Sequence, residues 1–303
     1  MRRGSRRQRG TVLLLMSPWI VGFLVFYVYP MLATLYYSFT HFDLLSRPQW
    51  VGFSNYRFMF TRDPFFWQSV RNTLWIIVVG VPIQIVFALS VAMVLTRPKR
   101  GVGIYRTIFF LPSMIPAVAA TLGFLFLLNP VGPIDHILHA LHIPAPLWFQ
   151  DPHYAKPGLV VLSIWGIGET MIIMLAGLLD VPAQLYEAAD IEGASGWQKF
   201  RYVTLPMISP VIFFAIVIGV IQGFQYFTQG FIASSAASSG ATLGDPQGSL
   251  LFYTIWLYVQ GFTASHLGYA SAMAWVLFLI ILACTVAIFR SSSRWVHYQG
   301  ALR

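Results

Sequence analysis

Long stretches with almost no charged side chain dominate this sequence and restrict it to a membrane fold. Because an α-helix rises about 1.5 Å per residue, about 20 apolar residues cross the roughly 30 Å hydrocarbon core of a bilayer. Stretches of this kind occur at about residues 12–36, 72–96, 107–130, 158–179, 205–233 and 267–289. We therefore predict an all-α polytopic membrane protein whose transmembrane domain, residues 12–290, contains six transmembrane helices.

The composition agrees with a surface that is covered by lipid. Only 10% of the residues are charged, whereas a typical soluble domain carries about 25%. A net charge of +9 would also suit a nucleic-acid ligand, but the basic residues lie at the ends of the apolar stretches and form no face interleaved with aromatic side chains. We expect membrane lipid, and no nucleic acid, as a partner. The single cysteine, Cys284, excludes an intrachain disulfide bond.

The distribution of Lys and Arg predicts how the helices are oriented. Five arginines lie in the N-terminal tail, residues 1–11; four basic residues lie between the second and third spans, two between the fourth and fifth, and three from residue 290 onward. The opposite side keeps Arg47, Arg57, Arg62, Arg71 and Lys156. Because cytoplasmic segments carry the excess of basic residues, both termini, including the tail of residues 291–303, are predicted to be cytoplasmic.

The basic tail before an apolar run also has the pattern of a secretory signal peptide. Such a signal has an apolar region of about 7–15 residues and a cleavage site of small residues. The apolar run here extends from Val12 to about Phe39, contains Pro18 and Pro30, and shows no such site. We therefore expect a first spanning helix that is retained.

Three longer segments lie on the predicted outer side, at about residues 40–70, 135–157 and 234–266. Their aromatic side chains suit either aromatic belts at the membrane interface or the docking of another protein. Residues 234–248 are rich in Ser, Gly and Ala, which predicts a flexible loop. The apolar run of residues 250–259 is too short to span a bilayer, so we expect an interfacial or re-entrant helix there.

The segment between the fourth and fifth spans, residues 181–206, has the pattern of two short helices. Pro182 suits the first turn of a helix, and Gly193 can adopt the backbone conformation that ends it. Ser195 and Gln198 have the spacing of a capping box for a second helix. Such a hairpin could lie on the membrane surface, but several acidic side chains with few basic ones match anionic headgroups poorly. A helical knob for a groove on another protein explains the composition better.

Residues within this segment closely resemble the Glu-Ala-Ala signature of binding-protein-dependent ABC importer permeases: Glu187-Ala188-Ala189, Gly193-Ala194, Phe200, Leu205-Pro206 and Pro210. The signature usually has Asp before the glycine, where this sequence has Glu192 and keeps the charge. In that family the segment is a coupling helix that docks into a cleft on a cytoplasmic ATPase. The resemblance implies this coupling role for Glu187, Ala188, Ala189, Asp190, Glu192, Gly193, Ala194, Phe200, Leu205 and Pro206.

The resemblance extends along nearly the whole chain. The sequence is similar to the maltose, lactose and glycerol-phosphate branch of the family at residues 17–30, 51–56, 71–73, 106–112 and 268–272. It implies the core of a type I ABC importer permease in a bacterial cytoplasmic membrane. The implied partners are a second homologous permease subunit, two ATPase subunits and an external solute-binding protein or lipoprotein. ATP and Mg²⁺ would bind to the ATPases, so the resemblance implies a non-catalytic chain without a cofactor, which moves its substrate by alternating access.

Polar side chains inside the predicted spans are candidates for a substrate site, because a charged group at the bilayer centre costs at least about 2.5–3.5 kcal/mol and tends to face a cavity. Glu169 lies near the middle of the fourth span. Gln222, Gln225 and Gln229 have the spacing that places them on one face of a helical fifth span. Ser113 lies between two prolines, where we expect the third helix to be distorted.

Glu169 and the three glutamines have an alternative role in helix–helix contacts. We predict that the substrate contacts Ser113, Trp165, Glu169, Gln222, Gln225 and Tyr226 through hydrogen bonds and ring stacking, the combination that suits a sugar. No basic residue lies within any predicted span, which favours a neutral oligosaccharide or disaccharide. Glycerol phosphate, another phosphodiester or a polyol stays open as an alternative, because a partner subunit can supply a charge.

Two other classes of protein also stay open. An ion-driven transporter would need several membrane acids or bases as a relay, and Glu169 alone is available. A membrane enzyme would need clustered catalytic or metal-binding groups. His136, His139 and His142 follow one another at a spacing of three, but Asp135 is the one carboxylate near them. We therefore expect a solvated or interfacial segment there and no metal site.

Overall fold

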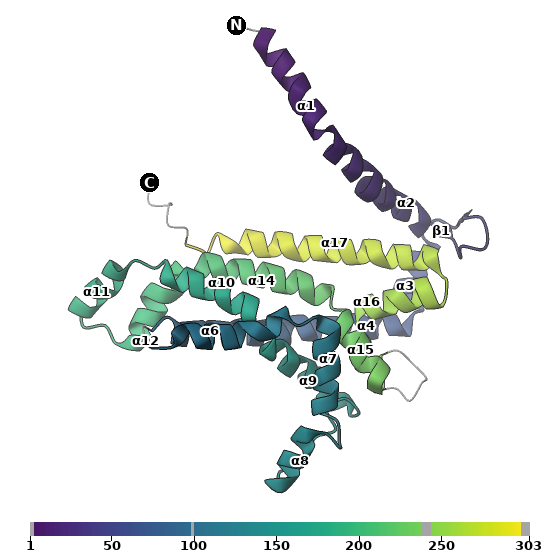
Figure 1. The fold of residues 1–303 in the computed structure, drawn as a ribbon. Helices are drawn as coiled ribbons and strands as arrows, with labels where there is room; N and C mark the ends of the chain where they lie inside the picture. The colour runs from purple at the N-terminus through teal and green to yellow at the C-terminus, as the bar shows by residue number, and fades with distance from the viewer. Residues whose placement is uncertain (1–2, 98–99, 238–243, 298–303) are drawn as a thin grey trace. The chain divides into compact units, whose positions relative to one another are not determined.

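The computed structural model describes residues 3–97, 100–237 and 244–297, and most of them are helical (Figure 1). The chain divides into two compact units. The first unit comprises Met1–Asp63 and Leu257–Phe278, and the second comprises Pro64–Trp256 and Leu279–Arg303.

Three helices are long and apolar enough to cross a membrane unbroken: Val12–Ser38, Pro64–Leu95 and Leu267–Ser292. Three further helix pairs are bent: Val102–Met114 with Ala117–Leu127 by 100°, Pro152–Trp165 with Gly168–Leu179 by 51°, and Gly196–Met207 with Ser209–Phe224 by 65°. With each bent pair taken as one span, the described residues contain six. The prediction of an all-α polytopic membrane protein with six spans is confirmed, and half of these spans are broken.

The first span is one helical rod made of α1 (Arg3–Phe23), the π-turn η1 (Leu24–Val28) and α2 (Tyr29–Ser38). It reaches back to Arg3, into the segment predicted as a tail. Pro30 lies in the first turn of α2 and has no backbone N–H to donate. The wider π-turn lies directly before α2 and changes the helical hydrogen-bond pattern there. None of the most apolar window of this rod is buried, which fits a helix that contacts lipid.

The second span consists of α4 (Pro64–Trp75), the π-turn η2 (Ile76–Gly80) and α5 (Val81–Leu95). It begins at Pro64 and therefore includes Arg71, and α9 (Pro152–Trp165) likewise includes Lys156. The prediction that no basic residue lies within a span is wrong at these two helix starts, and the candidate spans also include Arg106, Lys199, Arg201 and Arg290. Helices continue beyond the hydrocarbon core, and long basic side chains near their ends can reach the interface.

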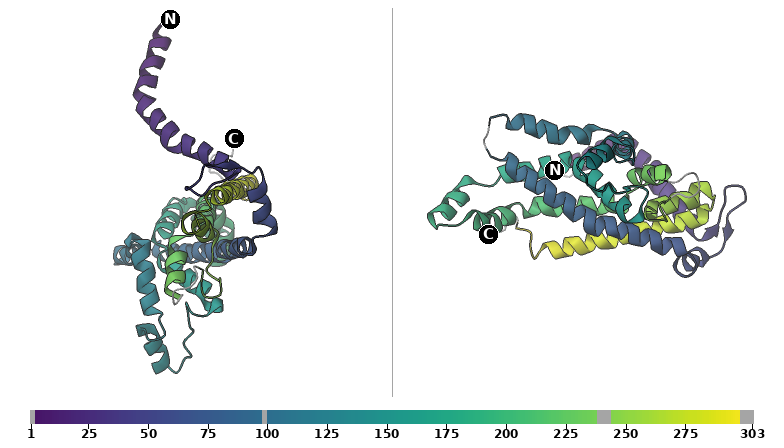
Figure 2. Two further views of the ribbon diagram at one scale, coloured as in Figure 1. Left: turned by 90° about the vertical axis from the view of Figure 1, so that its right-hand side faces the viewer. Right: turned by 90° about the horizontal axis from the view of Figure 1, so that it is seen from below.

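The predicted third span, residues 107–130, is two helices. α6 (Val102–Phe110) passes through the 3₁₀ turn η3 (Leu111–Met114), and the chain then turns into α7 (Ala117–Leu127). Ile115 is extended, with ψ at 129°, because the ring of Pro116 disfavours helical backbone in the preceding residue. The change of direction can be followed in Figures 1 and 2.

The fourth and fifth spans are also interrupted. α9 and α10 (Gly168–Leu179) are separated by Gly166 and Ile167. A helical run of α12 (Gly196–Lys199), η4 (Phe200–Thr204) and α13 (Leu205–Met207) bends into α14 (Ser209–Phe224). The prediction of a single helix over residues 205–233 is wrong at its far end, since α14 ends at Phe224 and α15 (Thr228–Ala237) follows as a separate helix.

Short elements occupy the connecting segments: the antiparallel pair β1 (Thr40–His41) and β2 (Gln49–Trp50), α3 (Ser54–Thr61), α8 (Pro133–Ala140), α11 (Ala183–Ile191), and α16 (Tyr253–Tyr258) with the π-turn η5 (Val259–Thr263). The predicted flexible loop, residues 234–248, is helical up to Ala237. Residues 238–243 of that loop and 298–303 of the predicted C-terminal tail lie outside the described residues. The last span, α17 (Leu267–Ser292), extends into the predicted tail.

Hydrogen bonds hold the first unit together where α2, α3 and the start of α17 meet. Asn55 Nδ2 donates to the carbonyl oxygens of Ser38 and Thr40, at 2.9 Å each. The Tyr269 hydroxyl donates to Asp63 Oδ2 at 2.5 Å, and both side chains are buried. These contacts give a physical role to residues 51–56 and 268–272, two of the stretches that carried the family resemblance.

Two apolar clusters form the core of the second unit. The first contains Ala88, Met171 and Met174, which are fully buried on α5 and α10. The second contains Leu159 on α9 and Phe252 beside α16, also fully buried.

Substituting Gly268 tests the packing of the first unit. The Gly268 N–H donates to Phe42 O at 3.1 Å, and a Cβ at this position would overlap the carbonyl oxygen of Thr40. We expect Gly268→Ala to cost about 1–3 kcal/mol, as overpacking usually does, and to lower the thermal aggregation midpoint of the purified protein. Gly22→Ala is the matched control, because nothing lies within 4 Å of a Cβ there. Equal midpoints for the two variants would contradict this packing.

Candidate functional site

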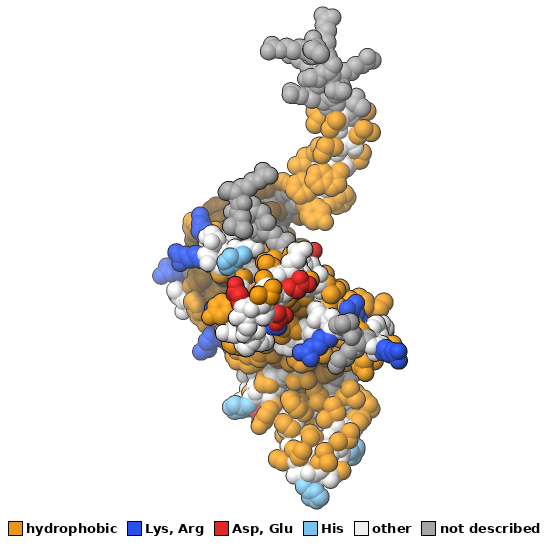
Figure 3. All heavy atoms as spheres, turned by 90° about the vertical axis from the view of Figure 1, so that its left-hand side faces the viewer, with side chains coloured by type: hydrophobic (Ala, Val, Ile, Leu, Met, Phe, Trp, Pro, Cys, Tyr) orange, Lys and Arg blue, Asp and Glu red, His pale blue; other side chains and the backbone are white. Residues whose placement is uncertain are grey.

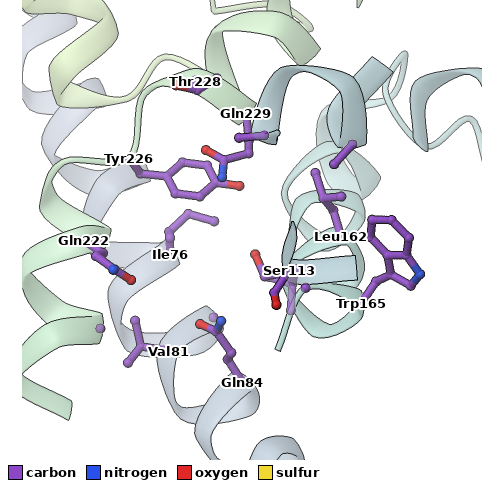
Figure 4. Close-up of a pocket in the computed structure, with 18 of the residues that line it drawn as sticks. Ile76, Val81, Gln84, Ser113, Leu162, Trp165, Gln222, Tyr226, Thr228 and Gln229 are labelled. Carbon is purple, nitrogen blue, oxygen red and sulfur yellow. The ribbon is translucent and has the colours of Figure 1, made fainter. Parts of the chain in front are cut away.

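A cavity of about 510 Å³ lies in the second unit, lined by α14, by the rod of η2 and α5, and by residues at three helix breaks (Figure 4). The breaks contribute Pro112 and Ile115 after α6, Gly166 between α9 and α10, and residues 225–227 between α14 and α15. Non-helical backbone at membrane depth leaves N–H and C=O groups without helical partners, and it is tolerated inside protein or against a water-filled cavity, not against lipid. The position of the breaks therefore fits the presence of the cavity.

The cavity brings together all the residues that were predicted to contact a substrate: Ser113, Trp165, Glu169, Gln222, Gln225 and Tyr226. Gln229 joins them, with three polar residues that the sequence reasoning left out: Gln84, Ser163 and Thr228. A signal for Gln84 was present, because it is the one glutamine in the predicted second span. Ser163 gave no such signal, since serine commonly bonds to its own helix, as it does here with Leu159 O at 2.9 Å.

The three glutamines reach the cavity by a route that helical spacing did not predict. Gln222 lies in the last turn of α14, Gln225 follows its end, and Gln229 belongs to the first turn of α15. Their shared helical face does not exist, because the helix on which it depended ends at Phe224. The chain instead bends around the cavity, and Figure 4 shows Gln222 and Gln229 on either side of Tyr226.

Tyr226 is the polar residue whose position in the cavity is most defined. Its hydroxyl is buried and makes no hydrogen bond of good geometry among the described residues, although the Ser163 side chain lies close to it. Its ring meets the ring of Phe252 edge-on, with centroids 5.3 Å apart and planes at 78°. A buried hydroxyl without a partner costs roughly 1–3 kcal/mol, and a ligand that donates or accepts a hydrogen bond there would recover it.

Glu169 lies in the first turn of α10, where the positive end of the helix dipole favours a carboxylate. The start of α10 packs tightly against the turn that carries Ser113: a Cβ on Gly168 would lie 2.7 Å from Ser113 Oγ and 2.9 Å from Phe110 Cα. Ser113 Oγ itself donates to Phe110 O at 2.6 Å. Trp165 lines the cavity but is poorly placed for the predicted stacking against a sugar. Figure 4 shows its indole directed away from Tyr226, and its ring centroid lies 5.3 Å from that of Phe124.

The charge of the cavity lining is simple. Glu169 is its carboxylate, and the described residues that line the cavity include no Lys or Arg. Amide and hydroxyl groups make up the rest of its polar surface, beside apolar side chains such as Ile76 and Phe227. This chemistry suits an uncharged ligand with many hydroxyl groups, since amides and hydroxyls both donate and accept hydrogen bonds.

The helical hairpin predicted from residues 181–206 is present, and we call α11, α12 and the turn between them (residues 183–199) the hairpin. Gly193 has φ at +75°, the left-handed conformation that ends α11. Ser195 and Gln198 form the predicted capping box, with Ser195 N donating to Gln198 Oε1 at 2.6 Å and Gln198 N donating to Ser195 Oγ at 3.4 Å. Lys199 Nζ pairs with Asp190 Oδ1 at 2.6 Å, which ties the two helices together.

The residues assigned to coupling, which lie in the hairpin and in η4 and α13 after it, differ in exposure. Glu187, Ala188, Asp190, Glu192 and Gly193 are exposed, whereas Ala189, Ala194, Phe200, Leu205 and Pro206 are partly buried. Two apolar side chains join the exposed side, with Ile191 at 88% and Trp197 at 71% exposure. Figure 3 shows acidic side chains gathered among apolar ones on this face. A surface that mixes exposed apolar groups with carboxylates is typical of a protein-binding site.

The histidine segment lies on and just after α8. Asp135 and His139 lie 3.4 Å apart on α8. Within residues 3–97, 100–237 and 244–297, no group of three or more His, Cys, Asp or Glu side chains is arranged to hold a metal ion. The reading of His136, His139 and His142 as a metal-dependent catalytic centre therefore has no support in the described part of the chain.

Broken spans around a polar cavity, together with an exposed helical hairpin, define a membrane-embedded, multi-pass protein of the transport class. Residues 84–297 match the family described as the binding-protein-dependent transport system inner membrane component. The chain belongs to this family, which confirms the resemblance seen in the sequence.

Curated relatives match over most of the chain. The chain is 40% identical over 286 residues to the "Probable ABC transporter permease protein YesP" of Bacillus subtilis (strain 168), covering 94% of this chain and 91% of that protein. It is 33% identical over 281 residues to the "Lactose transport system permease protein LacF" of Rhizobium radiobacter, covering 91% of each. Among solved structures, a bacterial ABC transporter involved in the import of the acidic polysaccharide alginate has the same fold, with a TM-score of 0.80, 23% identity, and coverage of 97% of this chain and 99% of that one.

Proposed function

We propose that this chain is the membrane-spanning permease subunit of an ATP-driven, binding-protein-dependent importer, and that a neutral oligosaccharide or disaccharide passes through its cavity into the cytoplasm by alternating access. The observation that carries the proposal is the cavity itself, formed at the breaks of membrane spans and lined by amides, hydroxyls and one carboxylate. An ion-driven transporter would need further ionisable groups for a relay, and the lining described above holds Glu169 alone.

The charge of the lining, more than the names of relatives, favours a neutral sugar. Two relatives are named for neutral sugars, the lactose permease LacF and the arabinooligosaccharide permease AraP of Bacillus subtilis. The sulfoquinovosyl glycerol permease SmoG of Agrobacterium fabrum and the alginate transporter are named for anionic ligands. An anion would meet Glu169 without a compensating cation from this chain. Glycerol phosphate, another phosphodiester or a polyol is the second candidate, for a complex in which the sister permease supplies the positive charge.

The proposed machinery assigns the energy source to other subunits. Two ATPase subunits bind ATP and Mg²⁺, a second homologous permease completes the pathway, and an external solute-binding protein or lipoprotein delivers the sugar. The hairpin docks on an ATPase through Glu187 and Glu192 and through the exposed Ile191 and Trp197. In this proposed arrangement the hairpin and both termini lie in the cytoplasm, which agrees with the distribution of basic residues.

The connectivity supports mechanical coupling between the hairpin and the cavity. α10, which carries Glu169, runs directly into the hairpin, and the hairpin continues through η4 and α13 into α14, which carries Gln222. Tyr186 and Thr204 join the two sides of the hairpin base by a hydrogen bond of 3.0 Å. A displacement of the hairpin by ATP-driven closure of the ATPases would therefore move two walls of the cavity together.

Glu169→Gln tests the cavity as the substrate site. The substitution keeps the shape and removes the charged acceptor, and hydrogen bonds to charged groups contribute about 1.5–3 kcal/mol. We expect the sugar concentration that half-maximally stimulates ATP hydrolysis by the reconstituted complex to rise at least about tenfold, with assembly unchanged. A panel of neutral and acidic oligosaccharides, first screened on the solute-binding protein, supplies the substrate. Unchanged stimulation would remove Glu169 from the site, and selection of an acidic sugar would overturn the neutral assignment.

Gly193→Ala tests the coupling role of the hairpin. An L side chain in the left-handed conformation costs roughly 1–2 kcal/mol, so alanine should shift the turn. Because 1–2 kcal/mol corresponds to a factor of roughly 5–30, we expect sugar-stimulated ATP hydrolysis to fall by about that factor. The matched control is Gly196→Ala, because both glycines have open space around them and only Gly193 has positive φ. Equal effects of the two substitutions, or wild-type coupling in Gly193→Ala, would refute the assignment.

A further inference from the structure

A short connecting segment, residues 248–254, is attached to α4 by side-chain hydrogen bonds, and we call this segment the strut. Asn72 Nδ2 donates to Gly248 O at 2.8 Å and to Leu251 O at 3.0 Å. The backbone N–H of Tyr253 donates to Thr73 Oγ1 at 2.9 Å. Because α4 continues into η2, which lines the cavity at Ile76 and Gly80, the strut is fixed to one wall of the cavity.

The orientation of the Asn72 amide is itself fixed. Lys156 Nζ donates to Asn72 Oδ1 at 3.0 Å, while the ammonium group lies 5.5 Å from the ring centroid of Trp75. With its oxygen engaged by Lys156, the amide must present its NH₂ group to the two strut carbonyls. This accounts for both the buried Asn72 and the half-buried lysine.

The other end of the strut holds Tyr226. Thr254 Oγ1 donates to the backbone carbonyl of Tyr226 at 2.7 Å, and Phe252 packs against its ring. Phe252 is fully buried and presses against α15 where Gly230 leaves room for it, since a Cβ on Gly230 would lie 2.5 Å from Phe252 Cδ2. Both the backbone and the ring of Tyr226 therefore rest on the strut.

Tyr226 needs such support because it belongs to neither adjacent helix. α14 ends at Phe224 and α15 begins at Thr228, so Tyr226 is joined to α14 by one long backbone hydrogen bond, from its N–H to Gly223 O at 3.4 Å. Its buried hydroxyl lies close to the Ser163 side chain but makes no well-formed hydrogen bond in the described part of the chain, so that end is held weakly.

We propose that Thr254 is a positioning residue for substrate binding: through the strut, which Asn72 anchors to α4, it holds the Tyr226 hydroxyl at the place in the cavity where a sugar hydroxyl meets it. The inference rests on the proposed function of the cavity. Neither Thr254 nor Asn72 lines the cavity, so the inference assigns a role in substrate binding to residues outside the lining.

Hydrogen exchange of the assembled transporter, measured without any sugar, tests the positioning. Thr254→Val keeps the shape of the side chain and removes the hydroxyl, so we expect backbone amides in residues 225–231 to exchange about fivefold faster. Thr254→Ser should restore wild-type exchange. Thr96→Val is the matched control, because the Thr96 hydroxyl bonds only within its own helix end, to Met93 O at 2.7 Å. Unchanged exchange in Thr254→Val, or faster exchange that also includes the hairpin, would overturn the positioning role.

A double-mutant cycle connects the position of Tyr226 to binding, with lactose and maltose as the probes of stimulated ATP hydrolysis. If Thr254 acts through Tyr226, Thr254→Val and Tyr226→Phe each raise the half-maximal sugar concentration, and the double variant is no worse than Tyr226→Phe alone. Independent, multiplying effects would contradict the proposal. If exchange responds as expected while Tyr226→Phe leaves stimulation unchanged, the cavity assignment fails and the proposed role of Thr254 in binding fails with it.

Discussion

The requirement that every backbone N–H and C=O group be satisfied inside a membrane shapes this structure more than any other constraint. A continuous helix meets it without help, and the spans Val12–Ser38, Pro64–Leu95 and Leu267–Ser292 do so. The other three spans interrupt their helices: the breaks before α7 and α10 line the cavity, whereas the bend at Ile208 before α14 is buried among apolar side chains. The polar cavity and the helix breaks that line it therefore depend on each other, because exposed backbone and polar side chains would both be unfavourable against lipid.

In the proposed mechanism, the same breaks would let parts of the chain move separately. α10 and α14 approach the cavity from the hairpin and end at its breaks, so each is a lever with one end at the proposed motor and the other at the proposed substrate site. The close crossings along α14 support this view. A Cβ on Gly219 would lie 2.7 Å from Val81 Cγ1, and one on Gly223 would lie 2.6 Å from Ile77 Cγ1, so the backbones approach each other without intervening side chains. Small residues at such crossings let two helix backbones approach closely.

Local sequence signals predicted the local features of this fold well. The length of the apolar stretches identified the spans, and the capping box and Gly193 defined the hairpin, because both depend on residues a few positions apart. The prolines around Ser113 indicated a distortion, though not its 100° angle. The polar residues expected to face a cavity do line one, because burying such groups against lipid is costly whatever the tertiary arrangement.

Features that depend on contacts between segments far apart in the sequence could not be predicted from it. No proline marks the end of α14 at Phe224, and the bonds that hold Tyr226 come from the strut, far along the chain. Asn72 gave no sign of its role, since its partners lie at Gly248 and Leu251. The helix starts were misplaced because charge was taken as the limit of a span, whereas Arg71 and Lys156 lie within helices that extend past the hydrocarbon core.

The central claim is that the cavity at the helix breaks holds water and substrate, and thiol labelling measures this directly. In a Cys284→Ser background, a single cysteine replaces Gln222 on the cavity wall or Val86, which is 63% exposed on α5 away from the cavity. A small charged thiol reagent reacts only where water reaches. The account predicts that the cysteine at 222 is labelled in the assembled transporter, is protected by the transported sugar, and reacts far faster than the cysteine at 86. Equal reactivity at both positions, or no labelling at 222 in any nucleotide state, would contradict it.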